Sequence, residues 1–311
     1  MGRRLLTIVM AVLMAAACHS PSASARPVTL GMSVSMDAAS DSEVARQFEL
    51  LDEMKIKMVR FDFDWSVIEP VRGQFDWSHT DRMVRAATAH GIAVLALLTY
   101  APAWARAPGT SSHAPPIDVA DFAHFARAAT ERYAPLGVTD WEVWNEPNTV
   151  DFWEPKPSAD DYGALFRATA AAVRDVDPSA TLISGGLTRG TTTDDRSRIA
   201  QTEFIEDLYA NGVAQLADAL AVHPYSFPDL PAADVTTRVG SIADLPAVRA
   251  VMERWGDTSK QIWVTEFGAA TGSGDNVMTE NDQAASLASS VQPASVRIKA
   301  PIWPAACPGS G

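Results

Sequence analysis

The chain has 311 residues, 47% of them hydrophobic, and a formal net charge of −13 at pH 7. This length suits one large barrel or two small domains, and the apolar content is ample for a core. The negative charge disfavours binding to nucleic acid or to an anionic membrane surface, so the expected partner is a neutral or cationic substrate. We expect a monomer with no nucleic-acid partner.

Residues 1–25 are expected to form an export signal rather than part of the fold. Two arginines precede an apolar run, Leu5 to Ala17, that is too short to span a bilayer, and small residues follow it. Ala23 to Ala25 fits ordinary signal removal, whereas Ala15 to Cys18 resembles a bacterial lipobox that would place a lipid on Cys18. The protein is therefore expected outside the cell or in the cell envelope, touching a membrane only through such an anchor.

The two cysteines, Cys18 and Cys307, lie near the two ends of the chain. This spacing gives no disulfide framework and no Cys/His cluster for zinc. The sequence also contains no phosphate-binding loop, metal motif or nucleotide fingerprint. We therefore expect neither a metal nor a cofactor.

Strand-like and helical runs alternate along the chain, which is typical of a parallel sheet wrapped by helices. The predicted strands are residues 28–32, 58–63, 92–98, 141–146, 181–184, 219–223 and 261–266. The predicted helices contain residues 44–51, 78–90, 119–133, 159–173, 204–209 and 246–255, and a last one begins near 280. The connections that leave the strands are long and rich in Gly, Pro, Ser and Thr, so a site is expected at the strands' carboxyl ends.

The end of the chain breaks this alternation. After Asp282 there is no acidic residue, and prolines recur without a helical or strand period. We expect a barrel over residues 26–287 and an irregular tail over 288–311 that reads as foreign, frame-shifted or truncated sequence. Strands 1 and 7 would then have unpaired edges, and the fold would be marginally stable and prone to aggregation.

Two strand ends carry a glutamate followed by a residue that breaks the strand. The first is Glu146, in the segment from Trp141 to Asn148, and the second is Glu266, in the segment from Gln261 to Gly268. Because 120 residues separate them (266 − 146), only the fold can bring the two acids together. A proline after Glu146 predicts that the first strand ends at this residue.

Both segments resemble the signature strands of the clan A glycoside hydrolases, the (β/α)8 group that contains cellulases, xylanases and β-xylosidases. The resemblance runs from about Thr29 to about Leu287. It implies a (β/α)8 TIM-type barrel, of which the irregular tail leaves the eighth strand and helix without a regular sequence. It also implies Glu146 as acid/base and Glu266 as nucleophile of a retaining β-glycosidase that hydrolyses O-glycosidic bonds of a neutral poly- or oligosaccharide. Retention requires the two carboxyl groups to lie about 5–5.5 Å apart.

Other residues match supporting positions of this clan. Arg60 matches the strand-2 arginine that would keep the nucleophile charged, and Asn145 matches the asparagine that bonds the sugar 2-hydroxyl. His223 and Tyr225 match the strand-6 pair that positions nucleophile and substrate. Among the tryptophans, Trp104 is the preferred platform for stacking on a sugar ring.

The remaining polar and aromatic residues near these strands allow simpler interpretations. Trp141 and Trp144 are candidates to keep water away from the acid, although Trp141 can also point away from it. Asp62, Asp64 and Glu69 read as solvated or structural carboxylates. Two non-catalytic functions remain open: a carbohydrate-binding relic of the same fold, and a lipoprotein scaffold at the cell envelope.

Overall fold

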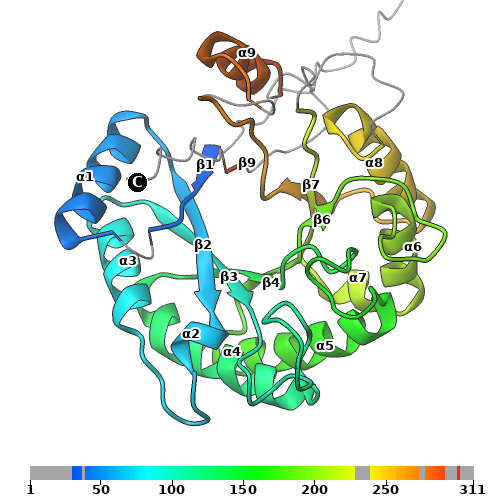
Figure 1. Ribbon diagram of the computed structural model, residues 1–311, viewed down its shortest axis with the longest axis horizontal. Coiled ribbons are helices and arrows are strands. Elements are labelled where there is room, and N and C mark those ends of the chain that lie inside the picture. The colour runs from blue at the N-terminus through cyan, green and yellow to red at the C-terminus, as the bar shows by residue number, and fades with distance from the viewer. Residues whose placement is uncertain (1–29, 37–38, 228–238, 273–276, 291–299, 302–311) are drawn as a thin grey trace, which may run out of the picture.

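The computed structural model describes residues 30–36, 39–227, 239–272, 277–290 and 300–301. The proposed export signal, residues 1–25, lies outside this part of the chain, as do residues 291–299 and 302–311 of the predicted irregular tail. The described residues form a curled parallel sheet with helices around its outer side (Figure 1).

The strands follow the predicted order along the chain, and every pairing between named strands is parallel. Their bounds are β1 Leu30–Ser33, β2 Met58–Asp64, β3 Ala93–Thr99, β4 Asp140–Val143, β5 Thr181–Ser184, β6 Leu187–Thr188, β7 Ala219–His223, β8 Gln261–Val264 and β9 Ala300–Pro301. The sheet order is β6-β7-β5-β4-β3-β2-β1-β9, with β8 on the other side of β7. Both β5 and β6 pair with β7, so β6 continues the line of β5 after a break at Gly185 and Gly186.

The helices lie between successive strands and turn one apolar face toward the sheet. Their bounds are α1 Asp41–Glu53, α2 Trp65–Ile68, α3 Ser78–Ala89, α4 Val119–Tyr133, α5 Ala159–Val176, α6 Gln201–Ala210, α7 Val213–Leu216, α8 Leu245–Arg254 and α9 Glu280–Ser290. In α1 the buried residues are Val44, Phe48 and Leu51, the stripe predicted from the sequence, and a Ser40–Glu43 capping box starts the helix. None of the described helices combines the length and apolarity needed to cross a bilayer.

The sheet separates an inner layer of side chains from an outer one, because side chains alternate along each strand. Met58, Leu95, Ile183 and Trp263 pack together on the inner face. The outer face belongs to the larger core under the helices, where for example the rings of Phe63 and Trp141 form a T-shaped pair with centroids 5.8 Å apart. Trp141 therefore points away from the inner layer.

Two strands end earlier than the sequence predicts. β4 ends at Val143 and β8 at Val264, so both glutamates lie beyond their strands instead of at the last strand position. After β4 the backbone enters the left-handed region at Trp144 (φ 67°) and again at Glu146 (φ 42°), which no strand can include. The proline after Glu146 does not keep that residue extended, contrary to the expectation.

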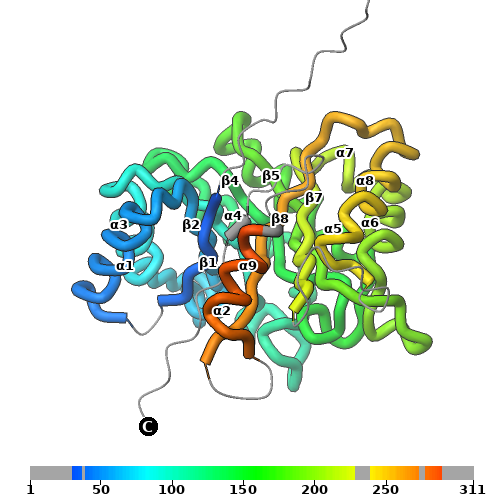
Figure 2. Tube along the Cα trace, turned by 90° about the horizontal axis from the view of Figure 1, so that it is seen from above, coloured from blue at the N-terminus to red at the C-terminus, as the bar shows by residue number. Residues whose placement is uncertain are grey.

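The eighth position of the barrel is irregular, which confirms the predicted fold. Because β6 continues β5, strand β8 occupies the seventh position. Within the described residues the eighth position contains only β9, in which Ala300 pairs with Leu30 of β1 and Pro301 with Gly31. No hydrogen-bonded pairing between β9 and β8 occurs among these residues. The last helix, α9, lies between α1 and α8 in the outer ring (Figures 1 and 2).

Candidate active site

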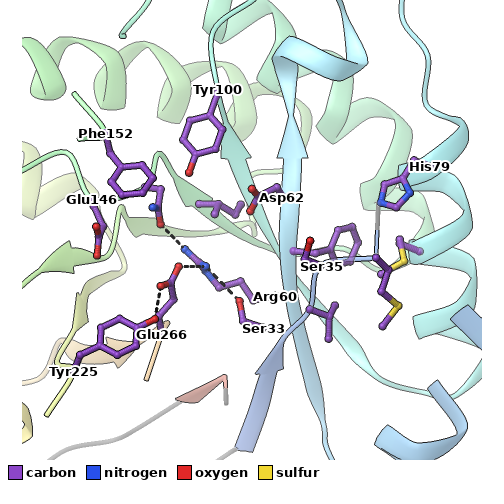
Figure 3. A pocket seen from close by; sticks show the side chains of 16 residues that line it. Ser33, Ser35, Arg60, Asp62, His79, Tyr100, Glu146, Phe152, Tyr225 and Glu266 are labelled. Atoms are coloured by element: carbon purple, nitrogen blue, oxygen red, sulfur yellow. Dashed lines mark hydrogen bonds and ion pairs between the residues drawn. The ribbon is translucent and has the colours of Figure 1, made fainter. Parts of the chain in front are cut away.

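A cavity of about 410 Å³ opens at the carboxyl ends of the strands (Figure 3). It is lined by Ser33, Val34, Ser35, Met36, Arg60, Phe61, Asp62, His79, Met83, Leu97, Tyr100, Asn145, Glu146, Phe152, Tyr225 and Glu266. His79 and Met83 belong to α3, and most of the other lining residues lie in or after strands that are far apart in the sequence. The curled sheet brings the ends of these strands together. The location is the one predicted from the long connections that leave the strands.

Glu146 and Glu266 meet at this cavity. One carboxylate oxygen of each residue and a ring nitrogen of His223 all lie within 4.8 Å of one another. His223 Nδ1 is 2.9 Å from Glu146 Oε1 and 3.6 Å from Glu266 Oε2. Burial by itself would lower the pKa of His223, but the charges of Glu266 and Glu146 outweigh it and raise the pKa above 6.5.

Arg60 organises the floor of the site from strand β2. Its side chain is nearly inaccessible to solvent, at 3% exposure. Nε donates to Glu142 Oε2 at 2.7 Å, Nη1 to Glu266 Oε1 at 2.7 Å, and Nη2 to Asn145 Oδ1 at 3.0 Å. Burial would lower the pKa of Arg60, but the carboxylates of Glu142 and Glu266 raise it above its ordinary value, so the guanidinium stays charged.

Glu266 has a partner on each oxygen. Arg60 holds Oε1, and the Tyr225 hydroxyl donates to Oε2 at 2.8 Å (Figure 3). Burial would raise the pKa of Glu266, but the charges of His223 and Arg60 and the bond from Tyr225 hold it below its ordinary value of 4.5. Burial and the charge of Glu266 in turn raise the pKa of Tyr225, so its phenol keeps the proton that it donates. The carboxylate of Glu266 is therefore ionised and fixed in orientation.

The turn that presents Glu146 is held by Tyr162 of α5 and by the two glycines that follow β5. The Tyr162 hydroxyl donates to Val143 O at 3.0 Å and accepts from Gly185 N at 2.8 Å, while Glu146 N donates to Gly186 O at 3.0 Å. A Cβ on Gly185 would lie 2.5 Å from Trp144 O, so glycine is required for this approach. These contacts keep Glu146 in its left-handed conformation, which by itself costs about 1–3 kcal/mol.

A further buried carboxylate, Glu142, was not anticipated. It is fully buried in β4 and points inward, where Oε1 accepts from Gly186 N at 2.9 Å and from Thr265 Oγ1 at 2.9 Å, besides its pairing with Arg60. The signal was present in the alternation of β4, because a Glu between Trp141 and Val143 must face the inside of a closed sheet. The predicted residues Arg60 and Asn145 both bond into this network.

The predicted tryptophan platform lies elsewhere. Trp104 is not among the described residues that line the cavity. Its indole N–H donates to Glu69 O at 2.8 Å, its ring meets Trp65 edge-on, and the Arg72 guanidinium lies over it at 4.2 Å. This placement does not fit a sugar platform, because a cation covers the ring. The loop after β3 turns Trp104 toward α2 and turns Tyr100 toward the cavity.

The phenyl and phenol rings that line the cavity are those of Phe61, Tyr100, Phe152 and Tyr225, and the imidazole of His79 lines it as well. Phe152 and Tyr100 stack with their centroids 6.2 Å apart. Asp62, interpreted from the sequence as solvated or structural, also lines the cavity (Figure 3). Trp144 lies beneath them, fully buried against Tyr100 and donating to Phe152 O at 2.7 Å.

Glu146, His223 and Glu266 are the described residues whose donor atoms are close enough to share a metal ion. Two features of the group favour proton transfer instead. Both oxygens of Glu266 are engaged, and Arg60 places a positive charge at 2.7 Å from one of them. A second cation there would be repelled by Arg60.

Comparison with known proteins gives a family. Residues 22–299 match the model of the family "Cellulase (glycosyl hydrolase family 5)". A β-xylosidase of Geobacillus stearothermophilus is 45% identical over 62 residues, which cover 19% of this chain and 11% of that protein. The chain thus matches only about a tenth of the length of this curated relative.

Solved structures share the fold. A family 39 glycoside hydrolase from Bacteroides cellulosilyticus WH2 superposes with a TM-score of 0.68 and 23% identity, over 89% of this chain and 56% of that one. A family 39 β-xylosidase from Caulobacter crescentus gives a TM-score of 0.69 and 21% identity, over 90% and 62%. The chain spans roughly three fifths of these proteins. With the family model covering most of its length, the chain belongs to the cellulase family, glycosyl hydrolase family 5, among the (β/α)8 glycoside hydrolases of clan A.

Proposed function

We propose that this protein is a retaining β-glycosidase in which Glu266 is the nucleophile and Glu146 the acid/base. The observation that carries the proposal is the approach of the two glutamates to within 4.8 Å at one cavity. This short separation favours retention, because an inverting enzyme needs about 6.5–9.5 Å to admit a water between its carboxyl groups.

The reaction proceeds in two displacements. In the first, a Glu266 oxygen forms a bond to the anomeric carbon while the glycosidic bond breaks and the proton on Glu146 passes to the leaving oxygen. In the second, Glu146 takes a proton from a water whose oxygen attacks the anomeric carbon, and Glu266 leaves. Each proton that Glu146 gives is thus recovered from water, and the anomeric configuration is retained.

The surroundings of the two acids support this division of roles. A nucleophile must be ionised, and Arg60 and Tyr225 hold Glu266 in that form. An acid/base must exchange a proton, and Glu146 bonds to a titratable partner, His223, at 2.9 Å. Asn145 has its amide oxygen engaged by Arg60, so the group it can offer to a sugar hydroxyl is its N–H donor.

The cavity favours a neutral sugar. Its volume of about 410 Å³ lies in the range of small-molecule sites, about 300–1,000 Å³. The aromatic rings of Tyr100 and Phe152 offer apolar surface, and Asp62 adds a carboxylate to the two catalytic ones. Because Arg60 is already paired with Glu142 and Glu266, an anionic sugar would meet net negative charge.

Variant kinetics on two substrates test the roles. Glu146→Ala should keep appreciable activity on a dinitrophenyl β-glycoside, whose leaving group departs unprotonated, and lose nearly all activity on an oligosaccharide. Glu266→Ala should lose both, and Glu131→Ala, which removes an exposed carboxylate of α4, should behave as wild type. An equal loss on both substrates in the Glu146 variant would overturn the assignment. Sugar binding by a wild-type protein without turnover would favour the carbohydrate-binding relic.

We also propose that residues 1–25 export the protein and that it acts as a monomer. Cell fractionation and the mass of the mature N-terminus distinguish cleavage after Ala25 from lipidation at Cys18. A mature protein that retains all of residues 1–25 in the cytoplasm would contradict export. Size-exclusion chromatography with light scattering tests the monomer.

A further inference from the structure

A buried chain of hydrogen bonds runs behind the acid/base and ends at the floor of the site. Arg60 Nε donates to Glu142 Oε2 at 2.7 Å, and Thr265 Oγ1 donates to Glu142 Oε1 at 2.9 Å. His223 Nε2 lies 3.1 Å from Thr265 Oγ1, and His223 Nδ1 lies 2.9 Å from Glu146 Oε1. Glu142, Thr265 and His223 are all fully buried, so water does not compete for these contacts.

The donor at each link follows from chemistry. The Glu142 carboxylate, paired with Arg60, can only accept. Thr265 has a single hydroxyl proton, which it gives to Glu142, so toward His223 its oxygen acts as an acceptor. His223 Nε2 must therefore carry a proton, and Nδ1 is the nitrogen whose proton can come and go. A Cβ on Gly186 would lie 2.1 Å from Nε2, so glycine there leaves room for this contact.

We propose that Glu142 and Thr265 are positioning residues that fix the tautomer of His223, so that the imidazole exchanges a proton with Glu146 through Nδ1 alone. This inference rests on the proposed function of Glu146. When the imidazole is neutral, its Nδ1 lone pair faces Glu146, and a stable contact at 2.9 Å then requires the proton to be on Glu146. His223 Nδ1 and Glu146 thus share one proton, which lies either on the imidazole or on the carboxyl group. That proton is available to the leaving group.

The charges around His223 determine the pH at which this shared proton is lost. Glu146 follows β4, Glu266 follows β8 and Tyr225 follows β7. Arg60 of β2 bonds to Glu266, and Glu142 of β4 is linked to the ring through Thr265. The loss leaves two negative glutamates beside a neutral ring. The first displacement then has no acid, so the proton's loss defines the alkaline limb of kcat/KM for substrates with poor leaving groups.

The informative change is Thr265→Val, which keeps the side chain's shape and removes the hydroxyl. Nε2 then has no acceptor, and the neutral ring can place its proton on Nδ1, where it donates to ionised Glu146 and favours loss of the acid's proton. The alkaline limb should move down by roughly one pH unit, as expected for about one hydrogen bond to a charged group. Above that limb, kcat/KM should fall about 10-fold on a poor-leaving-group glycoside, and little on a dinitrophenyl glycoside.

Thr265→Ser is the matched control, because it restores the hydroxyl, and its pH profile should coincide with the wild type. Identical profiles for the Val variant and the wild type, or equal losses in the Val and Ser variants, would overturn the proposal. A second measurement is independent of activity and of whether the Val variant folds. The 15N NMR signals of His223 in the wild-type protein at alkaline pH should show a protonated Nε2 and a bare Nδ1. The opposite tautomer would overturn the proposal, whereas the expected tautomer in a protein without glycosidase activity would refute only the proposed function.

Discussion

Replacing Glu142 by Gln should cost more stability than any surface change of the same kind. The substitution keeps the shape of the side chain and removes a charge that is fully buried and pairs with Arg60 at 2.7 Å. An amide NH2 in place of Oε2 would point a donor at the Arg60 Nε–H, so a contact is lost and a charge is left partly unpaired.

The loss of stability in Glu142→Gln depends on how many ion pairs Arg60 keeps. Removing one partner of a buried ion pair costs about 3–5 kcal/mol, and we expect about 3 kcal/mol because Glu266 still pairs with Arg60. For a domain of this size each kcal/mol lowers Tm by about 2–4 °C, so Glu142→Gln should melt roughly 6–12 °C below the wild type.

Thermal melts followed by far-UV circular dichroism at neutral pH measure this shift. The matched control is Glu206→Gln, which breaks a surface pair with Arg254 at 2.7 Å, where the side chains are 41% and 60% exposed. Such pairs contribute about 0–1 kcal/mol, so Tm should fall by no more than about 4 °C. If Glu142→Gln melts together with Glu206→Gln, the buried Arg60–Glu142 pair stabilises the fold no more than a surface pair does.

Four further outcomes are expected. Gly186→Ala would place a Cβ 2.1 Å from His223 Nε2, and the displaced ring should lower kcat about 100-fold on an oligosaccharide, whereas unchanged kinetics would mean that the ring has room to move. Tyr225→Phe removes a bond to Glu266 and should lower kcat/KM roughly 10–100-fold on good and poor leaving groups alike; a loss confined to poor ones would contradict this role. Because the pKa of Glu266 is depressed in the folded state, its contribution to stability is present above about pH 4.5 and is lost as the pH falls below it. Urea unfolding should therefore show the difference between wild type and Glu266→Gln shrinking below pH 4.5, and a difference that does not change with pH would contradict the shift. The irregular pairing at β9 should leave the chain prone to aggregation, and a soluble monomer with a cooperative melt above about 60 °C, in the upper mesophile range, would show that the barrel closes fully.

The two glutamates at the strand ends could be predicted from the sequence. Glu146 and Glu266 each follow a β-branched and aromatic run and precede a residue that breaks the strand. If all strands are parallel, both residues must therefore lie at the same end of the sheet. Arg60 stood out as a charge within an apolar strand. The distance between the two glutamates and the hydrogen-bond partners of all three residues could not be predicted, because they depend on how the sheet curls.

The buried contacts of Glu142 beneath the two glutamates could not be predicted from local sequence patterns. The Arg60–Glu142 pair joins residues 82 positions apart, and the Thr265–Glu142 bond joins residues 123 positions apart. Both depend on the register of several strands at once. The misplacement of Trp104 has a similar cause, since the turn after β3 decides which aromatic residue of that loop faces the cavity. An indole near a strand end does not by itself say which way its face points.

The anomer released first by the wild-type enzyme shows directly whether Glu266 acts as a nucleophile. Proton NMR of a β-glycoside during hydrolysis, recorded before mutarotation, distinguishes the two stereochemical outcomes. Two glutamates within 4.8 Å predict that the first product is the β-anomer. Initial release of the α-anomer would mean single displacement by water and would contradict the role of Glu266 as nucleophile.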